Sequence, residues 1–198
     1  MKMDILSSLE NVLAQLTAAH KKDPNRETWN NEVFPAEWLY IRRITDRLAS
    51  FSPEASTELV VAANCQHLCR WEIERKSFPE GRIGYYQWRN YLSDYQFQKA
   101  RDIILEAGFG DGFADRVKLI VKKENIFTNL EAQTLEDVVC LVFMEFYLDD
   151  FIRAKSELNM ATVILKTWNK MSEKGHQEAL KIQFSGETLP VVKRALGI

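Results

Sequence analysis

The spacing of apolar side chains is the feature that most limits what this chain can fold into. In the first such stretch, residues 3–22, the apolar positions are Ile5, Leu9, Val12, Leu13 and Leu16. Steps of three and four residues predict a helix that buries one side. The chain has only eight glycines and five prolines in 198 residues, which leaves room for many such helices.

The same reasoning, with turn and capping residues, divides the rest of the chain. Helices are predicted over about residues 35–50, 52–75, 84–107, 111–123, 134–154, 159–172, 176–182 and 187–196. Asp-Pro and a pair of asparagines make "KKDPNRETWNNEVFP" typical of a loop. No segment shows the alternation expected of a strand. We therefore expect an all-α protein, a single-domain irregular helical bundle over residues 1–198.

Composition excludes several classes of function. Net charge is −2, so no excess of positive charge indicates a nucleic-acid or membrane partner. No stretch approaches the roughly 18 apolar residues that a membrane span needs. The three cysteines, Cys65, Cys69 and Cys140, have no CxxC spacing and indicate reduced thiols. We expect a soluble cytoplasmic protein that binds neither DNA nor membranes.

Residues 62–90, "AANCQHLCRWEIERKSFPEGRIGYYQWRN", concentrate arginine and aromatic side chains. Guanidinium groups bind phosphate or carboxylate through two parallel hydrogen bonds, and aromatic rings hold them flat. The candidate ligand-binding residues are Gln66, Arg70, Trp71, Arg75, Arg82, Tyr85, Arg89 and, further along, Gln96. The alternative is that the arginines pair with nearby carboxylates and cover apolar surface.

His67 is the candidate catalytic base in this segment. On the predicted helix over 52–75 it shares a face with Asn64, Arg70 and Glu74. An imidazole beside a carboxylate serves as a general base near neutral pH. The alternative is a buried polar network that bonds only to itself.

Asp137 is the second candidate. It lies just before an apolar run, Val138 to Phe146, which predicts a central buried helix. We take Asp137 and its neighbour Glu136 as catalytic candidates. The alternative is that Asp137 forms a capping box with Thr134 at the start of the helix.

Three longer motifs resemble one known family. They are "NCQHLCRWEIERKSFPEGRIGYYQWR", "EAQTLEDVVCLVFMEFYLDDF" and "LKTWNKMSEKGHQEALKI". They resemble the family named domain of unknown function 4202. The resemblance covers about residues 23–183, and the family's name implies no activity.

The layout is more loosely similar to HD-domain proteins, which are helical metal-dependent phosphohydrolases and a few oxygenases. That resemblance implies that Gln66-His67 occupies the place of the His-Asp pair and Asp137 that of the last aspartate. It implies a divalent metal on His67 and Asp137. Gln66 and Gln96 stand where stronger ligands are expected, and amide oxygens bind transition metals poorly. Two strong ligands fall short of the three that catalytic zinc keeps.

Three functions follow from these observations. The first is a hydrolase that acts on a phosphorylated or other anionic small molecule. The second is a non-catalytic module that keeps the anion pocket without the metal. The third is a protein-interaction domain, since Trp, Tyr and Arg dominate interface energetics.

Overall fold

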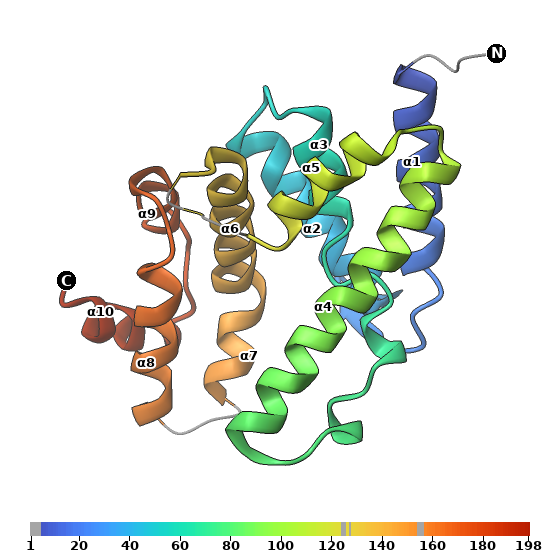
Figure 1. The fold of residues 1–198 in the computed structure, drawn as a ribbon. Coiled ribbons are helices and arrows are strands. Elements are labelled where there is room, and N and C mark those ends of the chain that lie inside the picture. The colour runs from blue at the N-terminus through green and yellow to red at the C-terminus, as the bar shows by residue number, and fades with distance from the viewer. Residues whose placement is uncertain (1–4, 124–125, 127, 154–156) are drawn as a thin grey trace. The chain divides into compact units, whose positions relative to one another are not determined.

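The computed structural model describes residues 5–123, 126, 128–153 and 157–198 (Figure 1). Ten α-helices and one two-stranded sheet lie in these residues, which confirms the predicted all-α class. The chain forms two compact units, Met1–Glu124 and Asn125–Ile198. The interpretation of the whole chain as one domain stays a prediction.

The first unit contains five helices among its described residues. They are α1 (Ile5–His20), α2 (Ala36–Phe51), α3 (Thr57–Asn64), α4 (Gly81–Glu106) and α5 (Asp111–Val121). The shorter elements are the strands β1 (Arg26–Trp29) and β2 (Glu32–Pro35) and the 3₁₀ turns η1 (Arg70–Glu72) and η2 (Arg75–Ser77). Helix α3 packs against α1, α2 and α5, which makes it the central element of this unit.

The core of the first unit is apolar and well closed. Its fully buried large side chains include Leu16, Leu39, Ile44, Leu68 and Ile104. Each contributes about 1.5–3 kcal/mol through removal of apolar area from water. The core therefore holds the segment after α3 in place, because Leu68 belongs to that segment.

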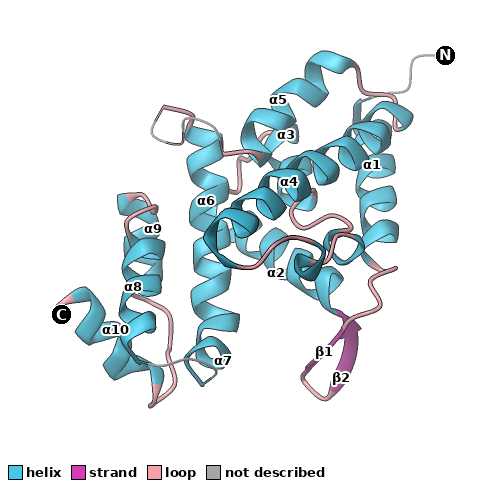
Figure 2. Cartoon of the chain, turned by 60° about the horizontal axis from the view of Figure 1, so that its bottom comes forward, coloured by secondary structure: helices cyan, strands magenta, loops and turns pink. Residues whose placement is uncertain are grey.

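The β-hairpin corrects the prediction of a loop over residues 21–35. Strands β1 and β2 pair antiparallel, with Arg26 opposite Pro35 and Trp29 opposite Glu32 (Figure 2). Between them Asn30 and Asn31 have φ of 51° and 64°. Two left-handed residues make a two-residue hairpin turn whose twist matches that of the strands.

The predicted helix over 52–75 is also wrong in both bounds. Helix α3 begins after Ser56, whose hydroxyl accepts a hydrogen bond from the Leu59 amide at 3.0 Å. It ends at Asn64, and His67 and Cys69 follow with φ of 56° and 53°. A left-handed residue cannot continue a right-handed helix. The helical face that was expected to join His67 to its neighbours therefore does not exist.

The second unit consists of α6 (Leu130–Val142), α7 (Leu148–Arg153), α8 (Glu157–Trp168), α9 (Glu173–Ala179) and α10 (Thr188–Leu196), with the π-helical segment η3 (Phe143–Tyr147) between α6 and α7. One apolar cluster joins α7, α8 and α10: Leu148, Met160, Ile164 and Val192 are all nearly inaccessible. For the helix predicted over residues 134–154, the predicted end lies outside the described residues.

Helix α6 begins one turn earlier than predicted. The side chain of Asn129 caps it by accepting hydrogen bonds from the amides of Glu131 and Ala132, both at 3.1 Å. Thr134 lies inside the helix and donates its hydroxyl to the Leu130 carbonyl at 2.8 Å. The capping box expected between Thr134 and Asp137 is therefore absent.

The three cysteines are free thiols, and all three are buried. Burial raises the pKa of Cys65 to about 12 and that of Cys69 to about 11. These two side chains stay protonated near neutral pH and act as small apolar groups. In the part of the chain that the structure describes, no helix is both long and apolar enough to cross a membrane.

Candidate functional site

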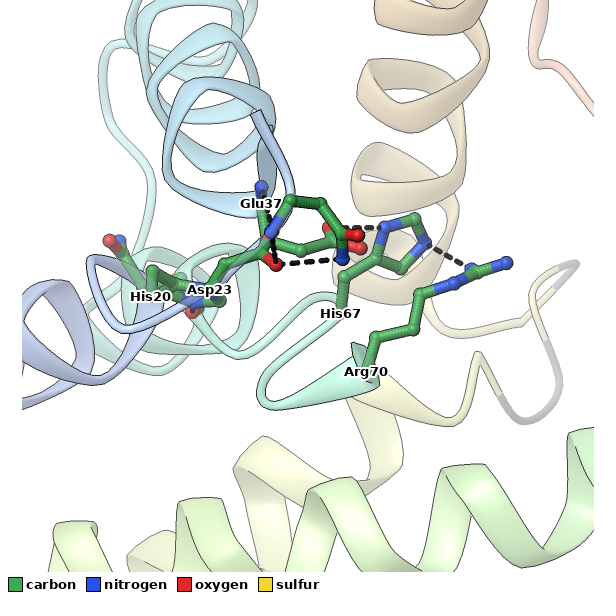
Figure 3. Close-up of polar contacts among 7 residues, drawn as sticks. His20, Asp23, Glu37, His67 and Arg70 are labelled. Carbon is green, nitrogen blue, oxygen red and sulfur yellow. Dashed lines mark hydrogen bonds and ion pairs between the residues drawn. The ribbon is translucent and has the colours of Figure 1, made fainter. Parts of the chain in front are cut away.

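The imidazole of His67 lies between an acidic and a basic side chain (Figure 3). Its Nδ1 lies 3.0 Å from Oε2 of Glu37, in the first turn of α2. Its Nε2 lies 3.2 Å from Nη1 of Arg70, at the start of η1. The left-handed turn after α3 thus presents His67 to a residue that lies 30 positions earlier in the chain.

The two contacts fix the tautomer of His67. A guanidinium group only donates, so Nε2 must accept the hydrogen bond from Arg70. The proton of the neutral ring then resides on Nδ1 and is donated to the Glu37 carboxylate. Tyr40 stacks on the same ring, with centroids 4.3 Å apart and planes 9° apart. The ring is therefore held in one position, and its neutral form in one tautomer.

The surroundings of His67 favour its neutral form. Burial lowers its pKa from the ordinary 6.5, the hydrogen bond and the charge of Glu37 raise it, and the positive charges of Arg70 and Lys123 lower it. The net direction is downward. Near neutral pH the imidazole is uncharged, the form required of a general base.

Asp23 holds the start of α2, and with it Glu37. Its Oδ2 accepts a hydrogen bond from the Glu37 amide at 2.9 Å, and its Oδ1 accepts bonds from the amide and side chain of Asn25 at 2.9 and 2.8 Å. The Asp23 residue is fully buried. A carboxylate at a helix N-terminus also interacts favourably with the helix dipole. Asp23 thus positions the backbone from which the Glu37 side chain extends.

His20, the last residue of α1, adds a second buried imidazole to this region. It is fully buried, and its Nε2 donates to the Asn64 carbonyl at 2.9 Å. Its Nδ1 therefore carries a lone pair, which meets no donor among the described residues. Burial lowers the pKa of His20, and the carboxylates of Glu37 and Asp23 oppose that shift.

A pocket of about 390 Å³ opens beside this cluster. Its lining residues are Pro24, Asn25, Glu37, Arg70, Trp71, Ile73, Glu74, Arg75 and Trp88. Glu37 and Arg70, the two partners of His67, both belong to that wall. His67 itself is not among the lining residues, so a molecule in the pocket can reach the imidazole's two partners, Glu37 and Arg70, rather than the ring.

Three of the predicted ligand-binding residues line this pocket: Arg70, Trp71 and Arg75. Arg75 uses its guanidinium to fasten the following loop, through the carbonyls of Phe78 at 3.0 Å, Pro79 at 2.9 Å and Gly81 at 3.3 Å. Arg70 lies over the ring of Trp88 at 5.2 Å. Its remaining contact to His67 is the one that a ligand can replace.

The structure does not bring the other predicted ligand-binding residues to this pocket. Arg82, Tyr85 and Arg89 are exposed on α4, with Arg89 over the Tyr85 ring at 6.0 Å. Gln66 is buried and donates to the Ala62 carbonyl of its own segment at 3.4 Å. Gln96 lies on α4, and its buried Nε2 meets no acceptor in the described part of the chain. Their roles in binding stay predictions.

Asp137 and Glu136 belong to the other compact unit. Asp137 is nearly inaccessible and accepts hydrogen bonds from the Ser172 amide at 2.7 Å, the Ser172 hydroxyl at 2.6 Å and the Gln133 side chain at 3.1 Å. Glu136 lies 3.3 Å from Lys170. Asp137 thus anchors the start of α9. The predicted convergence of His67 with Asp137 stays a prediction.

These contacts do not fit a metal site. Both nitrogens of His67 and both oxygens of Asp137 already have hydrogen-bond partners. Among residues 5–123, 126, 128–153 and 157–198, no three His, Cys, Asp or Glu side chains are grouped so as to hold a metal ion.

Sequence reasoning missed four members of the cluster: His20, Asp23, Glu37 and Tyr40. Asp23 and Pro24 predict only a turn, and the helix predicted over residues 3–22 gives His20 no particular role. Glu37 and Tyr40 carry no local signal, because their partner lies about 30 residues away. The fold places Glu37 and Tyr40 against His67, and His20 against the carbonyl of Asn64 at the end of α3. Asp23 is linked to this group through Glu37.

The fold and site define a class: a helical protein with a carboxylate–histidine–arginine arrangement beside a polar, tryptophan-lined pocket. The family described as domain of unknown function (DUF4202) matches residues 10–192. The chain therefore belongs to that family, as its motifs predicted. No curated protein matches the chain. No solved structure matches it either. The looser resemblance to HD-domain proteins stays a prediction.

Proposed function

We propose that the pocket binds a small molecule through an anionic group and that His67 acts on it as a general base in hydrolysis. One observation carries the proposal: His67 is held between Glu37 and Arg70, and both of these line the pocket. A phosphate ester or another anionic ester is the substrate class that these groups suit.

Glu37 supplies the hydrogen-bond acceptor and the negative charge that a histidine base needs. It accepts the Nδ1 proton and so keeps the lone pair on Nε2, the nitrogen on the far side of the ring. Its negative charge also stabilises the imidazolium that forms when Nε2 takes a proton. The Glu37 side chain is only 16% exposed, so water screens this interaction weakly.

Arg70 links binding to the base. Its bond to neutral Nε2 is weaker than the charge-assisted, two-pronged bond that a guanidinium makes to a phosphate or carboxylate. An anion in the pocket therefore draws Arg70 away and exposes Nε2. The imidazole then takes a proton from water as the water oxygen bonds to the phosphorus or acyl carbon. The leaving oxygen departs with its bonding electrons and receives that proton from the imidazolium.

A non-catalytic binding module is the alternative function. It is favoured by the same contact, because Arg70 occupies the nitrogen that a base must leave open. In that case the anion would bind to Arg70 without any water being activated. Binding alone does not separate the two functions, but turnover does.

The binding test compares two arginine variants of the full chain in a thermal unfolding experiment with inorganic phosphate. Arg70→Gln removes the proposed anion contact, and Arg82→Gln is the matched control because Arg82 is exposed and does not line the pocket. Phosphate at 100 times its Kd adds roughly 2.7 kcal/mol of stability. We expect that gain in the unaltered chain and in the control only. No gain in either would contradict the proposal.

The turnover test measures phosphate release from a panel of small phosphomonoesters and p-nitrophenolate release from the general probe p-nitrophenyl phosphate. We expect His67→Gln to lower the rate by about 100-fold or more, in the range for loss of a general base. His176→Gln is the control histidine variant. If phosphate binds and the rate of the unaltered chain equals that of His67→Gln for every probe, the protein is the non-catalytic module.

A further inference from the structure

The pocket wall carries positive and negative side chains. This inference rests on the proposed function, in which the pocket binds an anionic group, and it specifies what else the ligand carries. Two arginines, Arg70 and Arg75, and two glutamates, Glu37 and Glu74, line it. A site for a polyanion such as pyrophosphate would concentrate positive charge instead. Two carboxylates beside such a ligand repel it.

Not all four charges are equally open to a ligand. The Arg75 guanidinium donates to three backbone carbonyls, and Glu37 is the acceptor for His67. Arg70 and Glu74 keep contacts that a ligand can replace. Glu74 lies 2.8 Å from Lys76, but these two side chains are 53% and 82% exposed. Such exposed ion pairs contribute little and exchange readily.

The aromatic part of the wall also favours a positive group. The indole N–H of Trp88 already donates to the Ile73 carbonyl at 2.9 Å, and Arg70 lies over its ring, so Trp88 has neither group open to a ligand. Trp71 is half-buried and lines the same pocket as Glu74. An indole face together with a carboxylate is the combination that binds an ammonium group.

We propose that the ligand is a small zwitterion with its anionic group on Arg70 and its ammonium group on Glu74 and Trp71. One negative and one positive group on a short chain match the one replaceable cation and the one replaceable anion of the wall. Amino acids, amino phosphonates and phosphorylated amino alcohols share this chemistry. Ligands that carry only negative charge bind more weakly.

The test uses two probes of nearly equal shape, 2-aminoethylphosphonate and propylphosphonate, in which an ammonium replaces a methyl group. Calorimetric titration of the full chain at pH 7 should give at least tenfold tighter binding of the amino compound, a difference of about 1.4 kcal/mol. Glu74→Gln should reduce this preference to threefold or less. Glu80→Gln, a matched change at an exposed residue that does not line the pocket, should keep it.

Each outcome decides a different claim. Equal or tighter binding of propylphosphonate overturns the zwitterion and leaves the anion site of the proposed function intact. A preference that survives in Glu74→Gln assigns the ammonium elsewhere and also overturns it. If neither compound binds, the proposed anion site itself is wrong. Arg70→Gln should weaken both probes by the same factor, since it contacts the group they share.

Discussion

Nη1 of Arg70 lies 3.2 Å from Nε2 of His67, on the opposite side of the ring from Glu37. The imidazole therefore experiences opposed fields, one that favours its protonation and one that resists it. Because both neighbours line the pocket, any ligand that contacts one of them changes the balance. This relationship makes the protonation of His67 a direct measure of the state of the site.

Two substitutions that each replace a charged side chain by an uncharged one should move the pKa of His67 in opposite directions. Glu37→Gln removes a negative charge 3.0 Å from Nδ1, so the pKa should fall further below 6.5. Arg70→Gln removes a positive charge beside Nε2, so the pKa should rise. Nuclear magnetic resonance titration of the imidazole carbon-bound protons measures both.

The test is the sign of the two pKa shifts relative to the unaltered chain, because the charges of Glu37 and Arg70 act on His67 in opposite senses. The urea midpoint of each variant, measured at the same pH, checks that the fold is kept. Shifts of the same sign in the two variants would show that the charges on Glu37 and Arg70 do not control the ring.

Asp23 should be among the most sensitive positions in the first unit. Asp23→Ala leaves the amide of Glu37 and two N–H groups of Asn25 without their acceptor in a partly buried place. Unpaired buried donors cost about 1–3 kcal/mol each, and water can reach the exposed Asn25, so we expect a loss of about 2 kcal/mol. Urea unfolding measures it.

The control for that experiment is Asp115→Ala, a change at an exposed aspartate of α5. It should alter the free energy of unfolding by less than about 0.5 kcal/mol, as surface substitutions usually do. A loss below about 1 kcal/mol for Asp23→Ala would mean that Asp23 does not hold the start of α2.

The hairpin is a part of the fold for which the sequence contains a signal, although residues 21–35 as a whole are typical of a loop. Asn30-Asn31 between Trp29 and Glu32 is a recognised signal for two left-handed residues, because asparagine tolerates positive φ. The flanking strands are four residues long. Burial alternates along β1, but only between exposed and half-buried positions, and neither strand alternates apolar with polar residue types, the pattern that marks a strand in a sequence. The turn residues therefore predict the hairpin, and the strand residues do not.

The segment after α3 shows a part that local reasoning could not reach. Residue type gives no indication of the positive φ at Cys69 and only a weak one at His67, since neither glycine nor asparagine stands at these positions. Leu68, fully buried between them, indicates that tertiary packing imposes this turn. The pocket arginine Arg70 was found because arginine beside tryptophan is a chemical signal, whereas the Glu37 partner depends on the fold alone.

Acidification should destabilise the protein already between pH 6.5 and 5, before most carboxylates titrate. Burial lowers the pKa of His20 and of His67 below the 6.5 of an unfolded chain. In that window the unfolded state binds more protons than the folded state. The free energy of unfolding therefore falls as pH falls, by at most about 1.4 kcal/mol per pH unit for each group.

His20→Gln isolates one of the two contributions. The side-chain amide nitrogen of glutamine matches the position of the imidazole Nε2, so it keeps a donor for the Asn64 carbonyl and does not titrate in this range. Urea unfolding at pH 7.5, 6.5 and 5.5 should show a smaller loss of stability in the variant than in the unaltered chain. Stability that stays flat or rises between pH 6.5 and 5.5 in the unaltered chain would contradict the argument.

Gly175, in the second unit, has no room for a side chain, because the carboxylate of Asp137 lies where a Cβ would be. A Cβ at Gly175 would lie 2.7 Å from Oδ1 of Asp137, and the bonds from Ser172 and Gln133 hold that carboxylate in place. Gly175→Ala would gain up to about 1 kcal/mol in helix propensity. Overpacking costs about 1–3 kcal/mol, so the net effect should be destabilising by about 1–2 kcal/mol.

Gly112→Ala is the matched control, since Gly112 also lies in the first turn of its helix, α5, and its Cβ would meet only the Arg116 side chain at 3.7 Å. It should be neutral or stabilising by up to about 1 kcal/mol. Gly175→Ala should cost less stability in an Asp137→Ala background, because the crowded carboxylate oxygen is gone. A double-mutant cycle measures this difference. If the cost is unchanged in that background, the crowding does not come from Asp137, and this carboxylate is free to rotate away from the start of α9.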